Sequence, residues 1–187
     1  MTFGYGVLGL LVLIAAYLVY VYNSLISNRN LVGEGWSGID VQLRRRADLI
    51  PNLIETVKGY ASHEDKLFRD IADLRAKSIA GGSVGEQSQV GQAMSAALGR
   101  VFAIAEAYPE LKADANFRDL QDKLSAIEDE IQLSRRYYNG TVRNLNTQIE
   151  SFPSNIIANF FHFTKSDFFD IGDAAAREVP KVDFKIR

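Results

Sequence analysis

The most constraining feature of this chain is its N-terminal segment, because residues 2–28 contain no charged side chain. The stretch from Phe3 to Tyr22 is almost wholly apolar, and its roughly 20 residues would form about 30 Å of helix, which matches the hydrocarbon thickness of a bilayer. Aromatic side chains stand near both ends of the stretch, as is common at membrane interfaces. We therefore expect a transmembrane helix that includes Phe3, Leu8, Leu13, Val19 and Tyr22.

A cleaved signal peptide is the alternative interpretation of this segment, but it requires basic residues before the apolar stretch and a small-residue cleavage site after it. The sequence has neither. Basic side chains follow the stretch instead, at Arg29 and at Arg44 to Arg46. Since cytoplasmic flanks carry the excess of Lys and Arg, this asymmetry predicts a single-pass protein with its N-terminus outside and its C-terminal domain in the cytoplasm.

Beyond the apolar stretch, hydrophobic residues recur at alternating steps of four and three, which is the pattern of a helix with a heptad seam. The series runs to about Lys77, and only Arg46 and Glu64 place a charge in it. Pro51 lies inside the series and predicts either a kink or two helices that meet there. The seam positions are Val32, Trp36, Ile39, Leu43, Arg46, Ile50, Leu53, Val57, Tyr60, Glu64, Leu67, Ile71 and Leu74.

The two charges in the seam stand out because a buried charge without a partner is costly. One interpretation is that the stem of Arg46 extends toward solvent, or that Arg46 and Glu64 each pair with a neighbouring helix. The other is that they set helix register or bind a partner. The candidate contact residues of the seam are Trp36, Ile39, Arg46, Ile50, Leu53 and Glu64.

Glycine and proline divide the rest of the chain into two more helices. A connection rich in Gly and Ser at residues 80–85 precedes a helix whose apolar face begins at Val90 and which ends at Pro109. A third helix starts near Asp114 and stops at Pro153. The expected fold is all-α: a transmembrane helix, then an elongated antiparallel bundle of three main long helices, with a short C-terminal helix and an extended tail. The expected segments are an anchor at 1–28, the bundle at 29–152 and an aromatic-rich C-terminal segment at 153–187.

The C-terminal segment is dense in large apolar side chains and ends in an alternating pattern that is typical of a strand. If the first helix leads away from the membrane, the second returns and the third leads away again, the aromatic residues arrive at the membrane-distal end. An apolar patch there would serve subunit contacts, so we predict a homo-oligomer. The alternative is that the tail folds back over its own bundle. The candidate oligomer contacts are Phe152, Ile156, Phe160, Phe161, Phe163, Val182 and Phe184.

No pattern in the sequence indicates catalysis. The chain has no Cys, and neither His63 nor His162 has the partner residues of a helical metal site. Gly81 and Gly82 lack the following Lys of a phosphate loop. The net charge of −2 provides no basic face for nucleic acid. We therefore expect no enzymatic activity, no cofactor or metal, no small-molecule substrate and no nucleic-acid partner.

A series of short motifs extends over nearly the whole chain. In order they are Tyr22–Leu25, Trp36–Arg46, Asp48–Leu53, Val57–Tyr60, Tyr108–Lys112, Arg136–Asn139, Phe152–Asn155 and Pro180–Phe184. This series resembles the LemA family of bacterial membrane proteins. The resemblance implies an N-terminal membrane helix, a helical cytoplasmic domain and a place in the bacterial inner membrane, without an established enzymatic activity. It carries over no catalytic residue.

The leading hypothesis is a non-enzymatic, membrane-anchored helical scaffold that self-associates and organises an assembly at the inner membrane. A long seam joined directly to an anchor motivates it. Its expected partners are the lipid bilayer, further copies of the chain and other membrane proteins. One alternative is a lipid-binding or membrane-remodelling protein that acts through the aromatic tail and Arg44 to Arg46. Another is a regulatory partner of a membrane protease or sensor.

Overall fold

The computed structural model describes residues 2–61 and 63–169, with side chains from Gly4 onward. Every regular element in these ranges is a helix, so the predicted all-α class is confirmed. The tail segment, residues 163–169, follows the last helix without regular secondary structure. The helices are α1 (Thr2–Lys58), α2 (Asp65–Ala80), α3 (Val84–Ala107), α4 (Pro109–Ala113), α5 (Ala115–Glu150) and α6 (Ser154–Phe160).

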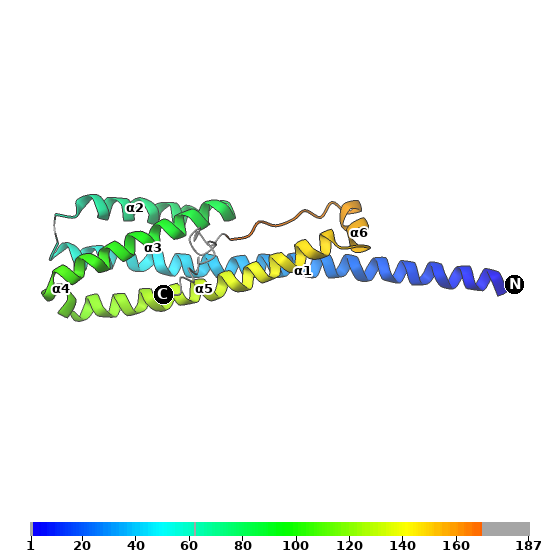
Figure 1. Ribbon diagram of the computed structural model, residues 1–187, viewed down its shortest axis with the longest axis horizontal. Coiled ribbons are helices and arrows are strands. Elements are labelled where there is room, and N and C mark those ends of the chain that lie inside the picture. The colour runs from blue at the N-terminus through cyan, green and yellow to red at the C-terminus, as the bar shows by residue number, and fades with distance from the viewer. Residues whose placement is uncertain (1, 62, 170–187) are drawn as a thin grey trace, which may run out of the picture.

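Helix α1 is the central element of an elongated molecule (Figure 1). Its 57 residues correspond to about 85 Å of helix, and α5 runs antiparallel beside much of it. Helices α2, α3 and α4 lie at the end that is distant from the N-terminus, whereas α6 lies beside the middle of α1. The N-terminal part of α1 extends alone beyond the bundle.

Pro51 does not end α1, so two helices do not meet there. A proline has no backbone donor, and the carbonyl of Ala47 therefore loses its usual partner one turn later. Arg75 of α2 replaces that partner, because its Nε donates to the Ala47 carbonyl at 2.8 Å. The chain leaves the helix at Gly59 instead, so the single helix predicted to run to about Lys77 is two helices, α1 and α2.

This additional reversal changes the direction of every later helix. Helix α2 returns toward the membrane end, α3 leads away and α5 returns again beside α1 (Figure 1). The aromatic residues after α5 therefore lie beside Tyr22 of α1 and not at the membrane-distal end. The predicted distal position of Phe160, Phe161 and Phe163 is wrong for this reason.

Polar caps explain where α3 and α5 begin. Ser83 Oγ accepts the N–H of Glu86 at 3.3 Å, and Glu86 Oε2 accepts the N–H of Ser83 at 2.8 Å, which is a capping box. Asp114 Oδ1 accepts the N–H of Phe117 at 2.9 Å at the start of α5. Each such cap stabilises its helix by about 1 kcal/mol.

The core consists of two apolar clusters along α1. The distal cluster joins α1 to α2, α3 and α5, and its fully buried members include Ile50, Leu53 and Ile71. The proximal cluster joins α1 to α5, α6 and the tail segment, and it includes Leu25 and Ile39. Because full burial of such a side chain contributes about 1.5–3 kcal/mol, the seam of α1 stabilises the molecule over most of its length.

Candidate membrane-surface site

The surface of α1 changes between Tyr20 and Val21. Every residue from Gly4 to Tyr20 is exposed although most are apolar, whereas Val21 is 3% exposed and Leu25 is fully buried. Among the described residues, α1 is the one helix that is long and apolar enough to cross a membrane. The exposed apolar portion is therefore the part that a bilayer can cover, and Val21 is where packing within the protein begins.

The residues predicted to span the membrane all lie in α1. Leu8, Leu13 and Val19 are 60–69% exposed. The side chain of Phe3 lies outside the described residues. Tyr22 is half-buried, because the C-terminal part of the chain packs against it.

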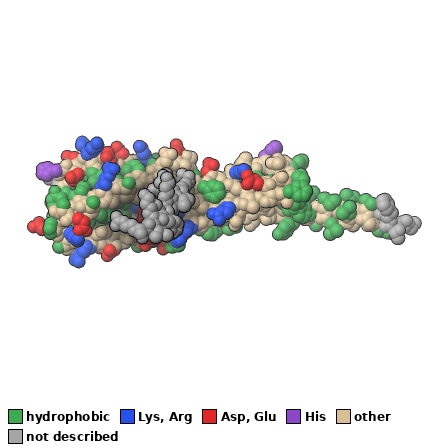
Figure 2. Space-filling model, in the orientation of Figure 1, with side chains coloured by type: hydrophobic (Ala, Val, Ile, Leu, Met, Phe, Trp, Pro, Cys, Tyr) green, Lys and Arg blue, Asp and Glu red, His purple; other side chains and the backbone are tan. Residues whose placement is uncertain are grey.

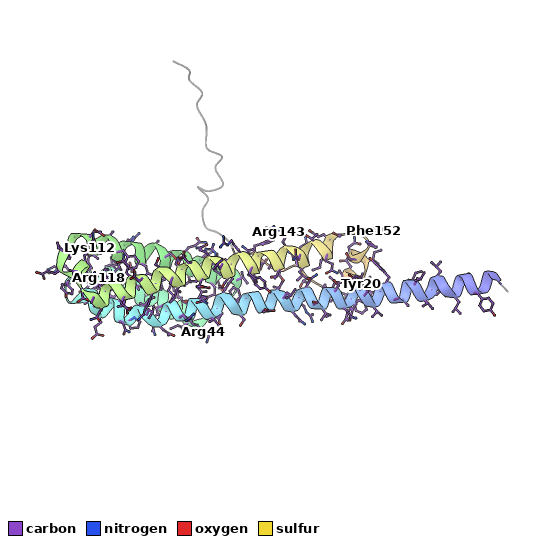
Figure 3. The ribbon with its side chains drawn as sticks, turned by 90° about the horizontal axis from the view of Figure 1, so that it is seen from below. Tyr20, Arg44, Lys112, Arg118, Arg143 and Phe152 are labelled. Carbon is purple, nitrogen blue, oxygen red and sulfur yellow. The ribbon has the colours of Figure 1, made fainter. Side chains whose placement is uncertain are left out.

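An aromatic cluster of Tyr22, Phe160, Phe161 and Phe163 lies at this boundary. The ring centroid of Tyr22 is 4.7 Å from that of Phe161 and 6.0 Å from that of Phe163, and Phe160 is 5.0 Å from Phe161. Figure 2 shows hydrophobic side chains gathered where the narrow N-terminal part meets the wider bundle. In Figure 3, Phe152 lies at the level of Tyr20, and Lys112 and Arg118 lie at the opposite end. The cluster has the position at which Tyr and other aromatic residues favour a membrane surface.

A groove of about 460 Å³ opens between α1 and α6 beside the aromatic cluster. Its lining side chains are all apolar, apart from the hydroxyl group of Tyr22. They are Leu18, Val19, Tyr22, Ile156, Ile157, Phe160 and Phe161.

Gln148 of α5 fixes α6 relative to α1. Its side-chain oxygen accepts a hydrogen bond from Asn28 Nδ2, and its Nε2 donates to Ser24 Oγ at 2.9 Å. Ser24 and Asn28 are one turn apart and share a face of α1. At the start of α6, Ser154 Oγ donates to the Gln148 carbonyl at 2.6 Å. These polar contacts hold the groove walls together, and nothing in the sequence pattern identified them.

Two asparagine side chains of α5 hold the tail segment. Asn146 accepts the N–H of Ser166 at 2.9 Å and donates to its carbonyl at 3.0 Å. Asn139 makes the same pair of bonds to Phe169, at 2.9 and 3.1 Å. Asn139 and Asn146 are seven residues apart, which is about 10 Å along a helix. Ser166 and Phe169 are three residues apart, which is also about 10 Å along an extended chain. The two asparagine side chains are therefore spaced to bind these two positions of the tail segment.

Phe169 closes the far end of the tail segment. Its side chain is 2% exposed. The ring centroid of Phe169 lies 5.0 Å from the guanidinium carbon of Arg135 and 6.1 Å from the ring centroid of Trp36.

Tyr138 of α5 also binds the tail segment, because its hydroxyl group donates to the Asp167 carbonyl at 2.8 Å. Burial raises the pKa of Tyr138, and the nearby carboxylate of Asp167 raises it further. The tail segment is therefore packed on its own bundle over residues 163–169.

Arg46, the charge in the middle of the seam, pairs with a neighbouring helix. The residue is 2% exposed, and its Nη1 lies 3.0 Å from both Glu128 Oε2 and Ser95 Oγ, while Nη2 donates to the Gly91 carbonyl at 3.3 Å. Burial lowers the pKa of Arg46, and the Glu128 carboxylate opposes that change. Glu128 is half-buried and also accepts a hydrogen bond from Ser95 Oγ at 3.1 Å, so the buried guanidinium has a charged partner in a small polar network.

The other predicted seam contacts lie in two kinds of environment. Ile39, Ile50 and Leu53 are fully buried, and Trp36 is half-buried. Glu64 is half-buried at the N-cap of α2, where its side chain makes no capping bond. Its position at the break between α1 and α2 explains why it does not behave as a seam residue.

The candidate oligomer contacts lie mostly on the surface. Phe152, Ile156, Phe160 and Phe161 are 80%, 60%, 75% and 50% exposed, and Phe163 is half-buried. Val182 and Phe184 lie outside the described residues. The exposed members lie near the membrane boundary of α1, at the level of Tyr20 and Tyr22.

Metal chemistry finds no support in the described part of the chain, where no three His, Cys, Asp or Glu side chains gather. The groove beside the aromatic cluster lies against the span, and the hydroxyl group of Tyr22 is the one polar side-chain group in its lining. What this arrangement offers is an anchor, an apolar surface and a long, well-packed bundle.

Comparison with known proteins identifies the family. The model of the LemA family matches residues 35–184, which is most of the chain. The chain belongs to the LemA family. It is 28% identical to protein LemA of Metamycoplasma hominis over 174 residues, which cover 89% of this chain and 75% of that protein.

Other LemA-family relatives are named as magnetosome proteins. The chain is 24% identical to magnetosome protein MamQ 2 of Paramagnetospirillum magneticum over 180 residues, or 82% of this chain and 66% of that protein. It is 24% identical to MamQ of Magnetospirillum gryphiswaldense over 88% of this chain and 70% of the relative. The chain thus spans about two thirds of the length of these proteins. The apolar α1 and these relatives identify it as a membrane-associated helical protein.

Proposed function

We propose that this LemA-family protein is a non-enzymatic scaffold of the bacterial inner membrane. The observation that carries the proposal is the continuity of α1, whose 57 residues run from the apolar span to the distal core. A helix without a break transmits the orientation of the anchor to the bundle, so the bundle projects from the membrane in a defined direction. In this proposal residues 1–28 form the anchor, 29–152 the bundle and 153–187 the aromatic-rich C-terminal segment and tail.

The basic residues after the span support a cytoplasmic bundle. Because the chain has no Cys, single cysteines can report its orientation. We expect Thr2→Cys to react with a membrane-impermeant maleimide added to spheroplasts, and Lys112→Cys, at the distal end, to react only after permeabilisation. The opposite labelling pattern would refute the orientation.

Self-association is the finer part of the scaffold proposal. The aromatic residues do not lie at the distal end, so that argument no longer supports self-association. Large apolar side chains are nevertheless exposed on α5, on the side of the aromatic cluster that is away from the span. Leu133 and Tyr137 are 50% and 49% exposed and lie one turn apart on α5. Light scattering of the full chain in detergent should give a multiple of the protomer mass, and Leu133→Glu should lower it. A protomer mass at all protein concentrations would exclude self-association.

A lipid-binding function is the second candidate, and the aromatic cluster favours it. Its rings lie at the boundary of the span, where they can enter a membrane surface. Flotation of a fragment from Val21 onward, which keeps Tyr22 of the cluster and the partners Ser24 and Asn28 of Gln148, with vesicles of phosphatidylethanolamine and phosphatidylglycerol separates the two candidates. The scaffold needs no affinity of this fragment for lipid, whereas the lipid-binding function requires it.

A further inference from the structure

We infer that the groove between α1 and α6 binds one acyl chain of a phospholipid from the leaflet that faces the bundle, with Arg29 placed to contact the phosphate of that lipid. The inference deepens the lipid-binding candidate and rests on the membrane anchoring of α1. It depends neither on which side of the membrane holds the bundle nor on self-association, so its failure leaves both of those claims standing.

The position of the groove determines its occupant. Leu18 and Val19 form one wall and belong to the exposed apolar portion of α1, while Ile156 and Phe160 of α6 form the other. When α1 spans a bilayer, the groove opens into the hydrocarbon layer, so the molecules that surround it are the acyl chains of lipids. Water has no hydrogen-bonding partner along these walls, apart from the hydroxyl group of Tyr22.

The size and rigidity of the groove suit one flexible chain. Its volume of about 460 Å³ lies within the range of small-molecule sites. Its floor includes Ile157, which is 4% exposed, and the bonds of Gln148 to Ser24 and Asn28 fix the distance between the walls. The site is therefore formed before the lipid arrives.

Arg29 lies where a headgroup would be. It follows Tyr22 by seven residues, or about 10 Å of helix, on the side away from the hydrocarbon. Its guanidinium carbon lies 5.6 Å from the ring centroid of Phe163, and the side chain forms no ion pair with a carboxylate of the described residues. Lys165, two residues beyond Phe163 in the sequence, pairs with Glu150. The positive charge of Arg29 is thus available to a phosphate.

Photolabelling of the full chain tests the acyl-chain site. The probe is phosphatidylglycerol that carries a diazirine in the half of one acyl chain nearest the headgroup. It is added in trace amount to nanodiscs of phosphatidylethanolamine and phosphatidylglycerol. We expect label on the peptide that contains Ser154 to Phe161. Val19→Trp fills the groove and should remove this label. Val12→Trp is the matched control and should keep it, because Val12 is equally exposed, at 59% against 61%, and lies seven residues away on the same face of α1.

A second pair of variants changes the other wall. Phe160→Ala should lower the label on α6, whereas Phe152→Ala should not, because Phe152 is similarly exposed but does not line the groove. Equal labelling of α6 in Val19→Trp and Val12→Trp, or in the two Phe variants, shows diffuse contact with bulk lipid and overturns the inference. Crosslinking of α6 to a second copy in place of lipid overturns it as well.

The headgroup contact has its own test. Arg29→Gln should lower the label on α6 about threefold, which is the effect of losing one exposed ion pair. Arg143→Gln, on α5 and away from the groove, is the control and should have no effect. Equal labelling in the two Arg variants overturns the assignment of Arg29.

Discussion

The hydrogen bond from Arg75 to the Ala47 carbonyl predicts an energetic coupling between Arg75 and Pro51. Ala47 is 1% exposed, so Arg75→Met leaves a buried acceptor without its donor while it keeps an unbranched apolar stem. An unsatisfied buried group costs about 1–3 kcal/mol. Since Arg75 itself is half-exposed and water can reach part of the site, we expect a loss of about 1.5 kcal/mol.

Pro51→Ala changes the result of the same substitution. Its restored N–H donates to the Ala47 carbonyl, so Arg75→Met should cost less than about 0.5 kcal/mol in that background, and the coupling free energy should be about 1 kcal/mol. Pro51→Ala alone should stabilise the chain, because Pro is the least favourable residue in a helix interior.

The assay is urea unfolding of the full chain in a mild detergent, followed by far-ultraviolet circular dichroism. Arg69→Met is the control, because Arg69 is an exposed residue of the same helix, and its effect should stay within about 0.5 kcal/mol. If Arg75→Met lowers the free energy of unfolding equally in the Pro51 and the Pro51→Ala backgrounds, the hydrogen bond from Arg75 to Ala47 does not compensate for the missing donor of the proline. That result would refute the reasoning.

Three further predictions concern the seam, the tail segment and pH. Leu53→Asp places an unpaired charge at a fully buried position and should cost about 4 kcal/mol, whereas Lys123→Ala should cost less than about 0.5 kcal/mol; equal melting temperatures would contradict the assigned seam. Asn146→Ala should cost about 1–2 kcal/mol and increase the hydrogen-exchange rate of the Ser166 amide, and an unchanged rate would show that the amide bond is unimportant. Burial raises the pKa of Tyr138 above 10.0, so its neutral form is favoured in the folded chain. The resulting stability is present below pH 10.0 and is lost as the pH rises through the raised pKa, and the decline should be smaller in Tyr138→Phe.

Local periodicity was sufficient to predict most of the helices. The heptad positions from Val32 to Val57 are buried or half-buried, and α5 starts after Asp114 as its capping pattern indicates. These features depend on residues a few positions apart, which a sequence displays directly. They account for the all-α class and for the apolar faces.

The direction of the helices could not be predicted in the same way. The interpretation of Pro51 as the break overlooked Arg75, which is distant in sequence but supplies the missing donor. Gly59 was the better signal for the end of α1, since glycine is common after the last helical residue. Because one reversal was misplaced, Phe160, Phe161 and Phe163 were predicted at the wrong end of the molecule.

The candidate site depends on tertiary contacts that the sequence does not mark. Asn139 and Asn146 hold the tail segment because an extended chain happens to lie beside α5, and Gln148 acts only because Ser24 and Asn28 face it. The spacing of seven between the two asparagines was the one available signal, and it indicates a common helix face without naming what lies there.

Because α1 is unbroken, the bundle tilts together with the membrane span as one rigid body. From Val21 to Lys58 the helix has roughly 38 residues, or about 57 Å. Transmembrane helices tilt by about 20° on average, and the tilt changes with the thickness of the hydrocarbon layer. A change in tilt of about 10° displaces the distal end, where α4 lies, by about 10 Å. Any protein bound at that end would therefore move sideways in response to the thickness of the membrane below it.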